Sequence, residues 1–294
     1  MNAPVFLLFL AAAVGPLVAA TTIDTSDRYA WAANLGWTNW AASPASGVVI
    51  GEYVCFGHIW VANCGWTSLG DGTPADGIRY SNSNGSDFGV NIRDAYSDGT
   101  TTRAKVRGLA YSSNIGWISF EDIGNPEISL VTGRLSGSAW SANCGWIPLS
   151  DTTNFLRSTK IRPGEDGDMD GIADAFELEL SVPATLTKYT FVGDYDGDGH
   201  SDVEEYVAGT NPGDSRSNLA IISFVVSGDN HTLTWASSPS RIYRVCSSLT
   251  LLPGFWTTLL NDIAPDSDIT SRQLTPEPQQ KRFYRVEARA PLSP

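Results

Sequence analysis

A phrase that occurs four times in the first half of the chain limits the possible folds more than any other feature. Each copy reads aromatic-x-x-Asn-x-Gly-Trp after an Ala or Ile, and with that residue the copies span residues 30–37, 59–66, 110–117 and 139–146. The Asn-x-Gly step tolerates positive φ and joins two short β-type runs, as in a β-hairpin. Successive Asn residues are 29, 51 and 29 positions apart, so the true unit can be a doublet that occurs twice. We expect a repeated antiparallel β-meander.

The aromatic residues of the repeat have two candidate roles. The second aromatic is Trp in every copy, which favours a core position where each ring packs on its neighbour. The first aromatic varies between Trp and Tyr, and an exposed row of such rings could stack on sugar rings. The residues expected in the core are Trp37, Trp66, Trp117 and Trp146, and those of the candidate ligand platform are Trp31, Trp60, Tyr111 and Trp140. The turn residues are Asn34, Asn63, Asn114 and Asn143.

Two segments of twelve residues follow the spacing Asp-x-Asp-x-Asp-Gly-x-x-Asp-x-x-Glu, and they begin at Asp166 and Asp194. In an EF-hand loop, oxygens at positions 1, 3 and 5, the carbonyl at 7 and a bidentate Glu at 12 hold calcium, and position 9 acts directly or through water. This spacing predicts two Ca2+ sites. The predicted ligands are Asp166, Asp168, Asp170, Ile172, Asp174 and Glu177 in loop one, and Asp194, Asp196, Asp198, His200, Asp202 and Glu205 in loop two.

Negative charge is concentrated in the same region. Residues 164–214 contain 14 acidic residues and one basic residue, Lys188. The whole chain has 32 acidic and 19 basic residues, so the remaining 18 of each sign cancel. A solvated acidic linker is the alternative, but a linker needs neither the fixed spacing nor apolar residues such as Ile172 and Phe176. No basic cluster indicates a nucleic-acid partner.

A short helix is expected after each loop, over residues 174–180 and 202–208, but none before it. A sensor EF-hand needs two helices per site to open and close, so we expect a structural use of calcium. With the following Tyr206-Val-Ala-Gly-Thr-Asn-Pro-Gly-Asp214, the loops resemble the thrombospondin type 3-like calcium repeats of secreted bacterial surface proteins. That resemblance implies calcium binding by the two loops and no particular activity elsewhere. Dockerins share one-helix loops but end in Asp at tighter spacing, which leaves cohesin binding as a minor alternative.

Residues 1–20 are mostly apolar and small, and they are typical of a secretory signal peptide that ends before Thr21. Gly15-Pro16 interrupts this run, which is shorter than the roughly 20 residues of a transmembrane helix. We therefore expect a secreted or cell-surface protein with no membrane span.

Four cysteines are present, and an oxidising compartment permits disulfides between them. Their three possible pairings stay open on the sequence, with a Cys55–Cys64 staple within one meander as one candidate. Cys64 and Cys144 occupy the slot that is Leu35 and Ile115 in the other copies, so both resemble buried apolar residues. The fourth cysteine is Cys246.

About six short strands between residues 218 and 290 suit an immunoglobulin- or fibronectin-like β-sandwich. This part could be an attachment module or a spacer, and the sequence does not separate the two. The chain is thus predicted to be mostly β, with four parts. These are a signal peptide (1–20), the repeat domain (21–160), the calcium-loop module (161–216) and the C-terminal sandwich (217–294).

No motif for catalysis is present: the chain lacks Gly-x-Ser-x-Gly, His-Glu-x-x-His and a phosphate loop. We predict that the chain is not an enzyme but a calcium-binding structural protein, in which calcium rigidifies the joint between β modules. Its candidate partners are calcium, polysaccharide and other copies of itself. Carbohydrate binding or adhesion through the repeat aromatics is the alternative, and a secreted hydrolase with paired carboxylates ranks third.

Overall fold

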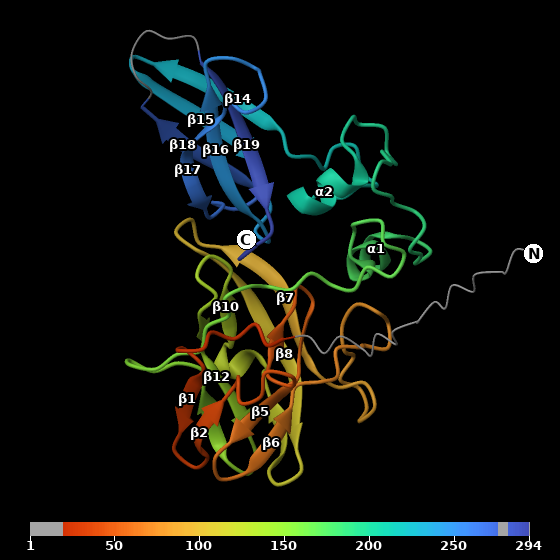
Figure 1. The fold of residues 1–294 in the computed structure, drawn as a ribbon, viewed down its shortest axis with the longest axis vertical. Coiled ribbons are helices and arrows are strands. Elements are labelled where there is room, and N and C mark those ends of the chain that lie inside the picture. The colour runs from red at the N-terminus through yellow and green to blue at the C-terminus, as the bar shows by residue number, and fades with distance from the viewer. Residues whose placement is uncertain (1–19, 276–281, 294) are drawn as a thin grey trace, which may run out of the picture.

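The computed structural model describes residues 20–275 and 282–293 and confirms a mostly β fold. The predicted signal peptide lies outside the described residues except for Ala20. Figure 1 shows a large sheet structure at one end of the molecule and two small sheets at the other. Two short helices, α1 (Asp174–Leu180) and α2 (Asp202–Ala208), lie beside the junction. Within the described ranges, neither helix is long and apolar enough to cross a membrane.

Four β-hairpins, one from each copy of the repeat, form a ring. They pair side by side in the order β1-β2-β5-β6-β8-β9-β12-β13. β13 returns beside β1, although no ladder joins those two strands among the described residues, so the ring is nearly closed. The strands are β1 (Tyr29–Ala32), β2 (Gly36–Asn39), β5 (His58–Val61), β6 (Gly65–Ser68), β8 (Thr102–Ser112), β9 (Gly116–Ser119), β12 (Ser138–Ser141) and β13 (Gly145–Pro148).

The repeat Trp residues lie outside this ring, so their predicted core position is wrong. In β1, Ala30 and Ala32 are buried while Trp31 between them is exposed, and Trp37 stands directly opposite Trp31 on β2. Directly opposed residues of an antiparallel pair share a face. The inward positions of the ring carry Ala, Ser, Thr, Val and Ile side chains instead. The four exposed residues that were expected in the core are Trp37, Trp66, Trp117 and Trp146.

The turn Asn residues do more than form turns, because they link neighbouring hairpins. Asn114 Nδ2 donates to the carbonyl of Cys64 at 2.8 Å, and Asn143 Nδ2 donates to the carbonyl of Ile115 at 3.0 Å. Asn34 Nδ2 donates to the carbonyl of Cys144 at 3.0 Å and so spans the seam between the last hairpin and the first. The four turns therefore gather at one end of the ring.

The long strand β8 carries the sheet beyond the ring. Its first half pairs with β7 on one side and with β10 on the other, and β7 continues to β4 and β3. The interior of this extension and the interior of the ring form one continuous hydrophobic core. The added elements are β3 (Val49–Ile50), β4 (Val54–Phe56), β7 (Val90–Ser97), the short 3-10 helix η1 (Asp122–Gly124), β10 (Glu127–Ser129) and β11 (Leu135–Ser136).

The C-terminal strands form two three-stranded antiparallel sheets in the orders β14-β15-β18 and β17-β16-β19. Trp235 of one sheet and Tyr243 and Val245 of the other meet in a shared core, as in a β-sandwich. The first, second and fifth of these six strands thus form one layer, and the third, fourth and sixth form the other. The strands are β14 (Ile221–Ser227), β15 (Asn230–Ala236), β16 (Ile242–Ser248), β17 (Thr257–Ile263), β18 (Ile269–Leu274) and β19 (Phe283–Arg289).

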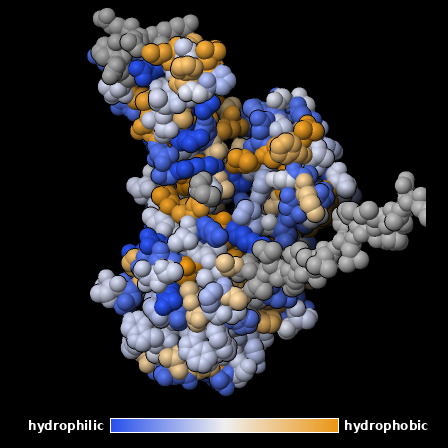
Figure 2. Space-filling view, in the orientation of Figure 1, coloured by the Kyte–Doolittle hydropathy of each residue, from blue (hydrophilic) through white to orange (hydrophobic). Residues whose placement is uncertain are grey.

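One edge of this sandwich is apolar and exposed. β14 is the outer strand of its sheet among the described residues, and every residue of it except Ser223 is exposed. Figure 2 shows apolar side chains gathered at the end of the molecule that the sandwich forms, whereas the opposite end is paler. The large apolar residues exposed on β14 are Ile221, Ile222, Phe224, Val225 and Val226.

Candidate metal centre

Each acid-rich loop folds around its first carboxylate. In loop one, the backbone N–H groups of Asp170 and Gly171 donate to Asp166 at 3.1 and 3.0 Å. The equivalent N–H groups of loop two donate to Asp194 at 3.1 and 3.0 Å. Gly171 has φ 88° and Gly199 has φ 96°, a region in which a Cβ is disfavoured. The two loops therefore make the same turn from the same residue types.

The turn brings most of the predicted ligand carboxylates together. Three sets of carboxylates each offer oxygens that lie within 4.8 Å of one another. Asp168 belongs to both sets of loop one, so the carboxylates of that loop converge around one position. The sets are Asp166, Asp168 and Asp174; Asp168, Asp170 and Glu177; and Asp194, Asp196 and Asp198.

The Glu at position 12 of each loop is buried without adequate partners. Glu177 is fully buried, and neither of its carboxylate oxygens has a hydrogen-bond partner; Glu205 is 2% exposed and has one such oxygen. Burial, reinforced by the neighbouring carboxylates, raises the pKa of Glu177 to about 8 and that of Glu205 to about 7. A buried carboxylate without a partner is costly. Both groups therefore fit a divalent cation that would supply the missing positive charge.

The Asp at position 9 of each loop accepts hydrogen bonds from backbone N–H groups. Asp174 Oδ1 accepts the N–H of Gly167 at 2.7 Å. The two oxygens of Asp202, which is 1% exposed, accept the N–H groups of Thr190 and Tyr195, both at 2.9 Å. Asp202 is thus held by the backbone on both oxygens, which suits the water-mediated role that position 9 can take.

Position 7 serves the packing of the loops as well as their predicted carbonyl ligands. The N–H groups of Ile172 and His200 each donate to the carboxylate two residues earlier, both at 2.9 Å. The side chain of Ile172 is fully buried and packs in a cluster with Phe176, Tyr189 and Tyr53. Since Tyr53 comes from the large-sheet region, loop one is anchored to that region through its apolar residue.

The helices confirm the expected half of an EF-hand. α1 and α2 begin at position 9 of their loops, and among the described residues no helix leads directly into either loop. α2 starts with a capping box, in which the N–H of Ser201 donates to Glu204 at 3.0 Å. It ends at Gly209, which has a left-handed φ of 71°. Each loop thus leads directly into one short helix.

Arg241 joins this segment to both β regions, and no sequence pattern marks it as a functional residue. Its side chain is 4% exposed, and its guanidinium bonds the carbonyls of Val207 and Tyr206 at 2.9 and 2.7 Å, at the end of α2. It also pairs with Glu52 of the large-sheet region at 2.8 Å. Glu52 accepts the hydroxyl of Tyr206 at 3.2 Å. Arg241 begins the run Arg-Ile-Tyr-Arg-Val, and Arg282 begins the near-copy Arg-Phe-Tyr-Arg-Val, so only the three-dimensional fold distinguishes the two arginines.

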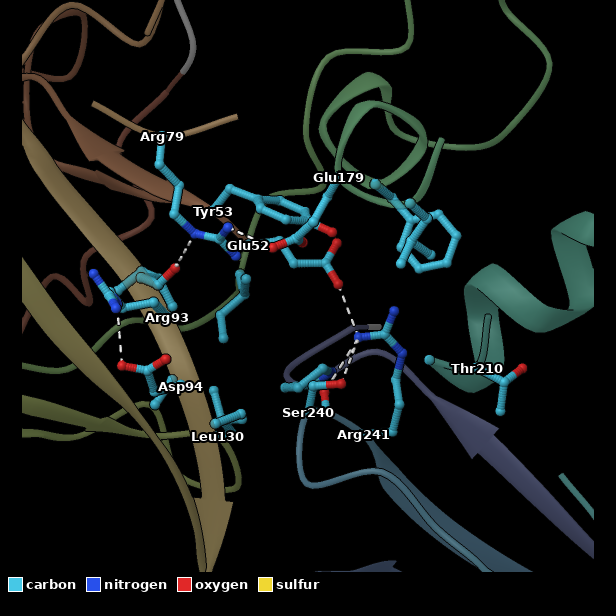
Figure 3. A pocket seen from close by; sticks show the side chains of 18 of the residues that line it. Glu52, Tyr53, Arg79, Arg93, Asp94, Leu130, Glu179, Thr210, Ser240 and Arg241 are labelled. Carbon is cyan, nitrogen blue, oxygen red and sulfur yellow. Dashed lines mark hydrogen bonds and ion pairs between the residues drawn. The ribbon is translucent and has the colours of Figure 1, made fainter. Parts of the chain in front are cut away.

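A cavity of about 310 Å³ opens beside this contact, between all three parts of the chain (Figure 3). Arg79 on one wall pairs with Glu179 of α1 at 2.6 Å, and Arg93 pairs with Asp94 at 3.0 Å. With Arg241 paired as well, each Arg that lines the cavity faces a carboxylate. The charged groups here connect the parts of the chain to one another.

The candidate ligand platform is exposed, and it is twice as large as expected. Its four residues, Trp31, Trp60, Tyr111 and Trp140, are 40–47% exposed, and the opposed Trp residues are 43–48% exposed. The rings contact each other across two of the hairpins: centroids are 5.0 Å apart for Trp60 and Trp66, and 4.8 Å for Tyr111 and Trp117. In the other two hairpins the aromatics stand directly opposite in the strand register. Four aromatic pairs therefore surround the outside of the ring. The two aromatics have the same spacing around the Asn-x-Gly turn in all four copies. That spacing is the sequence signal that could have placed both rings opposite each other on one face.

The resemblance to thrombospondin type 3-like repeats also extends to Asp214. This residue pairs with Arg216 at 3.1 Å and lies outside the three carboxylate sets.

Comparisons with known proteins leave the site to be interpreted from its geometry. Neither a protein-family model, nor a curated protein, nor a solved structure matches this chain.

Proposed function

We propose that the two loops bind one calcium ion each and that calcium fixes the joint between the β regions of a secreted structural protein. The observation that carries this proposal is the pair of buried position-12 carboxylates, because Glu177 and Glu205 have oxygens that no protein group satisfies. Hard cations such as calcium take six to eight oxygen ligands from carboxylates, carbonyls and water. In loop one, five carboxylates including that of Glu177 offer such oxygens close together. In loop two, Asp194, Asp196 and Asp198 do so, whereas Glu205 lies outside that set.

The proposed role of calcium follows from what lies next to its ligands. Glu205 precedes Tyr206, whose carbonyl and hydroxyl contact Arg241 and Glu52. Ile172 of loop one packs against Tyr53. A cation that holds the loops in shape would hold these contacts in place, and binding free energy would become folding free energy for the segment. The protein would then act as a non-enzymatic scaffold.

Export and self-association complete the proposal. The apolar character of residues 1–20 supports secretion, and outside the cytosol calcium can be present constantly. A second copy of the chain is the proposed protein partner, with β14 as the contact. This edge strand is uncharged and apolar, so antiparallel pairing of two copies meets no charge repulsion.

Calorimetry and limited proteolysis on the mature chain test the calcium proposal. We expect calorimetric titration to give two calcium ions per chain. We also expect EGTA to expose residues 160–215 to protease while the two β regions stay resistant. A chain that binds no calcium, or that is cleaved equally in calcium and in EGTA, would contradict the proposal. Magnesium at the same concentration is the control, since Mg²⁺ keeps most of its own water.

Carbohydrate binding is a second candidate function, favoured by the exposure of all eight repeat aromatics. Rings on the outside of the hairpins are free to stack on sugar rings. Quenching of tryptophan fluorescence by polysaccharides, followed by a glycan array, tests it. Binding should weaken in Trp60→Ala and persist in Leu252→Ala, an exposed apolar residue of the sandwich. If no polysaccharide changes the fluorescence, the aromatic pairs serve the stability of the hairpins instead.

A further inference from the structure

The outer face of the hairpins holds uncharged polar side chains between its aromatic pairs. Side chains alternate along a strand, so the residue two positions after the second aromatic of a hairpin shares the face of that aromatic. At three steps around the ring this residue stands directly opposite the first aromatic of the next hairpin. The opposed residues are Asn39 and Trp60, Ser68 and Tyr111, and Ser119 and Trp140.

The outer polar residues, Asn39, Ser68 and Ser119, are all held in the same way. The side-chain oxygen of each accepts the backbone N–H group two residues later, at 3.0, 3.2 and 3.3 Å respectively. All three residues are half-buried, so each is fixed in place and still reaches the surface. Within the described part of the chain, no protein acceptor takes the amide hydrogens of Asn39 or the two hydroxyl hydrogens. Each residue therefore keeps a hydrogen-bond donor for a ligand on this face.

The fourth step around the ring lacks such a donor. Pro148 occupies the equivalent position in the last hairpin, and its side chain has no hydrogen-bonding group. It is also the step at which β13 and β1 share no ladder in the described ranges. Three of the four steps therefore combine an exposed aromatic pair with a polar donor.

The composition of this face limits what it can bind. No Asp, Glu, Lys or Arg occurs in residues 31–39, 60–68, 111–119 or 140–148, although the whole chain has 32 acidic and 19 basic residues. The large apolar side chains that these segments expose are all aromatic, whereas β14 exposes mainly aliphatic ones. Amphipathic segments that bind lipid surfaces are rich in Lys and Arg, and Arg and Lys are also the usual partners of carboxylate and phosphate groups. A neutral ligand with apolar faces and hydroxyl groups fits this surface better than a lipid or an acidic polymer.

We propose that the outer face of the hairpins binds an uncharged polysaccharide, whose sugar rings stack on the aromatic pairs while its hydroxyls accept hydrogen bonds from the outer polar residues. The proposal rests on carbohydrate binding, the second candidate function above, and specifies the class of ligand. Neighbouring aromatic pairs are two strands apart, which is about 10 Å at the usual strand spacing. One polymer chain can therefore contact two hairpins at once, so affinity should increase with chain length.

Affinity electrophoresis of the calcium-saturated mature chain tests the ligand class. We expect laminarin, galactomannan or xyloglucan, which are neutral, to retard the protein, and we expect hyaluronate, which is acidic, to leave its mobility unchanged. Phosphatidylcholine vesicles should not sediment with it. Retardation by no polysaccharide would overturn both the proposal and the carbohydrate candidate. Retardation by hyaluronate alone would overturn only the proposal, and binding to vesicles alone would assign the face to lipid instead.

Variants test the residues that carry the proposal. Ser68→Ala keeps the rings and removes one donor, so it should weaken binding of the retarding polymer about 3–10-fold. Ser238→Ala is the matched control, because its Oγ accepts the N–H of Ser240 at 3.4 Å in the sandwich, away from this face. Equal affinities in the two variants would overturn the role of the outer polar residues. If Ser68→Ala is unfolded by circular dichroism, Ser119→Ala at the equivalent position decides.

The calcium proposal stands or fails separately from this one. The turns of the hairpins lie at the end of the molecule away from α1 and α2 (Figure 1). Glu177→Gln should therefore bind the retarding polysaccharide as the wild type does, whatever its calcium affinity. A loss of polysaccharide binding in Glu177→Gln would place the ligand near the calcium loops and overturn the assignment to the hairpins.

Discussion

At the scale of single residues, the acid-rich segment is unusual because it buries two carboxylates, a type of group that water stabilises strongly. Glu177 and Glu205 lie in the first turns of α1 and α2, where a carboxylate is favoured by the helix dipole. That effect is too small to compensate for removing a charge from water. A bound cation is the simplest source of the missing interaction.

The first prediction concerns Glu177. Glu177→Gln removes one negative ligand while keeping the shape of the side chain, so calcium affinity at loop one should fall by about 10–100-fold or more. Isothermal titration should then show one tight site instead of two. Glu165→Gln is the matched control, because Glu165 immediately precedes the loop and its side chain is 76% exposed. Equal affinities in the two variants would remove Glu177 from the ligand set.

Residues of the loops could be predicted from the sequence because their spacing is local. The turn, the carboxylate sets and the start of the following helices all lie within one motif. The error on Trp37 arises from a different kind of information. Its constancy in the repeat suggests burial, whereas its pairing with Trp31 places both rings on the same face. The presence of Trp at this position in every copy therefore reflects its pairing with the aromatic opposite it in the hairpin.

At the scale of elements, the protonation of Glu177 makes the stability of α1 depend on pH. Burial raises the pKa of Glu177 to about 8 from its ordinary value of 4.5. A raised pKa means that the folded state holds its proton more tightly than the unfolded state does. The contribution of this group is therefore complete below pH 4.5 and is lost as the pH rises towards 8.

The second prediction follows from that sign. Calcium-free protein should protect α1 better at about pH 5.5 than at about pH 8, as measured by protease resistance of the segment. Saturating calcium should reverse the order, because calcium binds the ionised carboxylates and competes with protons. The variant Glu177→Gln, which does not titrate, is expected to reduce the dependence on pH in metal-free buffer. The same pH trend with and without calcium would contradict this account.

The third prediction concerns the contact between elements at Arg241. Arg241→Ala leaves Glu52 and two helix carbonyls without their donor, so it should destabilise the folded chain by about 3 kcal/mol. Arg244→Ala, in the strand β16 that follows Arg241, removes a pair with Glu287 that is more exposed, and should cost no more than about 1 kcal/mol. Chemical denaturation measures both, and hydrogen exchange at the end of α2 should increase only in the first variant. Similar losses of unfolding free energy in the two variants would show that the buried contact contributes no more stability than the exposed pair.

At the scale of the whole molecule, three regions that are distant in the sequence meet at few points. Glu52, Tyr206 and Arg241 form one of them, and the end of the β7–β8 hairpin forms another. There Ser97 and Thr102 donate to the carbonyls of Pro265 and Pro239 of the sandwich. No sequence pattern predicts such contacts, because the residues that form each contact come from distant parts of the chain that share no repeat or motif. The mostly β class was predictable, but the geometry of the joint was not.

The fourth prediction concerns association of whole molecules. If two copies pair along β14, the mass measured by light scattering should rise with concentration towards that of a dimer. Val225→Lys places a charge on this edge strand and should keep the chain monomeric. The control Leu252→Lys changes a residue of similar exposure that lies off the edge, and it should still associate. A wild type that stays monomeric at all concentrations would exclude β14 as a self-association surface.

The ring of hairpins also restricts how this chain could have evolved. A linear solenoid can gain or lose a repeat, because each unit contacts only its neighbours. Here the last hairpin must accept a hydrogen bond from Asn34 of the first, so the number of copies is fixed by closure. Duplication could produce four hairpins from a doublet, but a fifth would have no place in the circle. New sequence is therefore expected between the hairpins, where the chain already leaves the ring to build β3, β4 and β7.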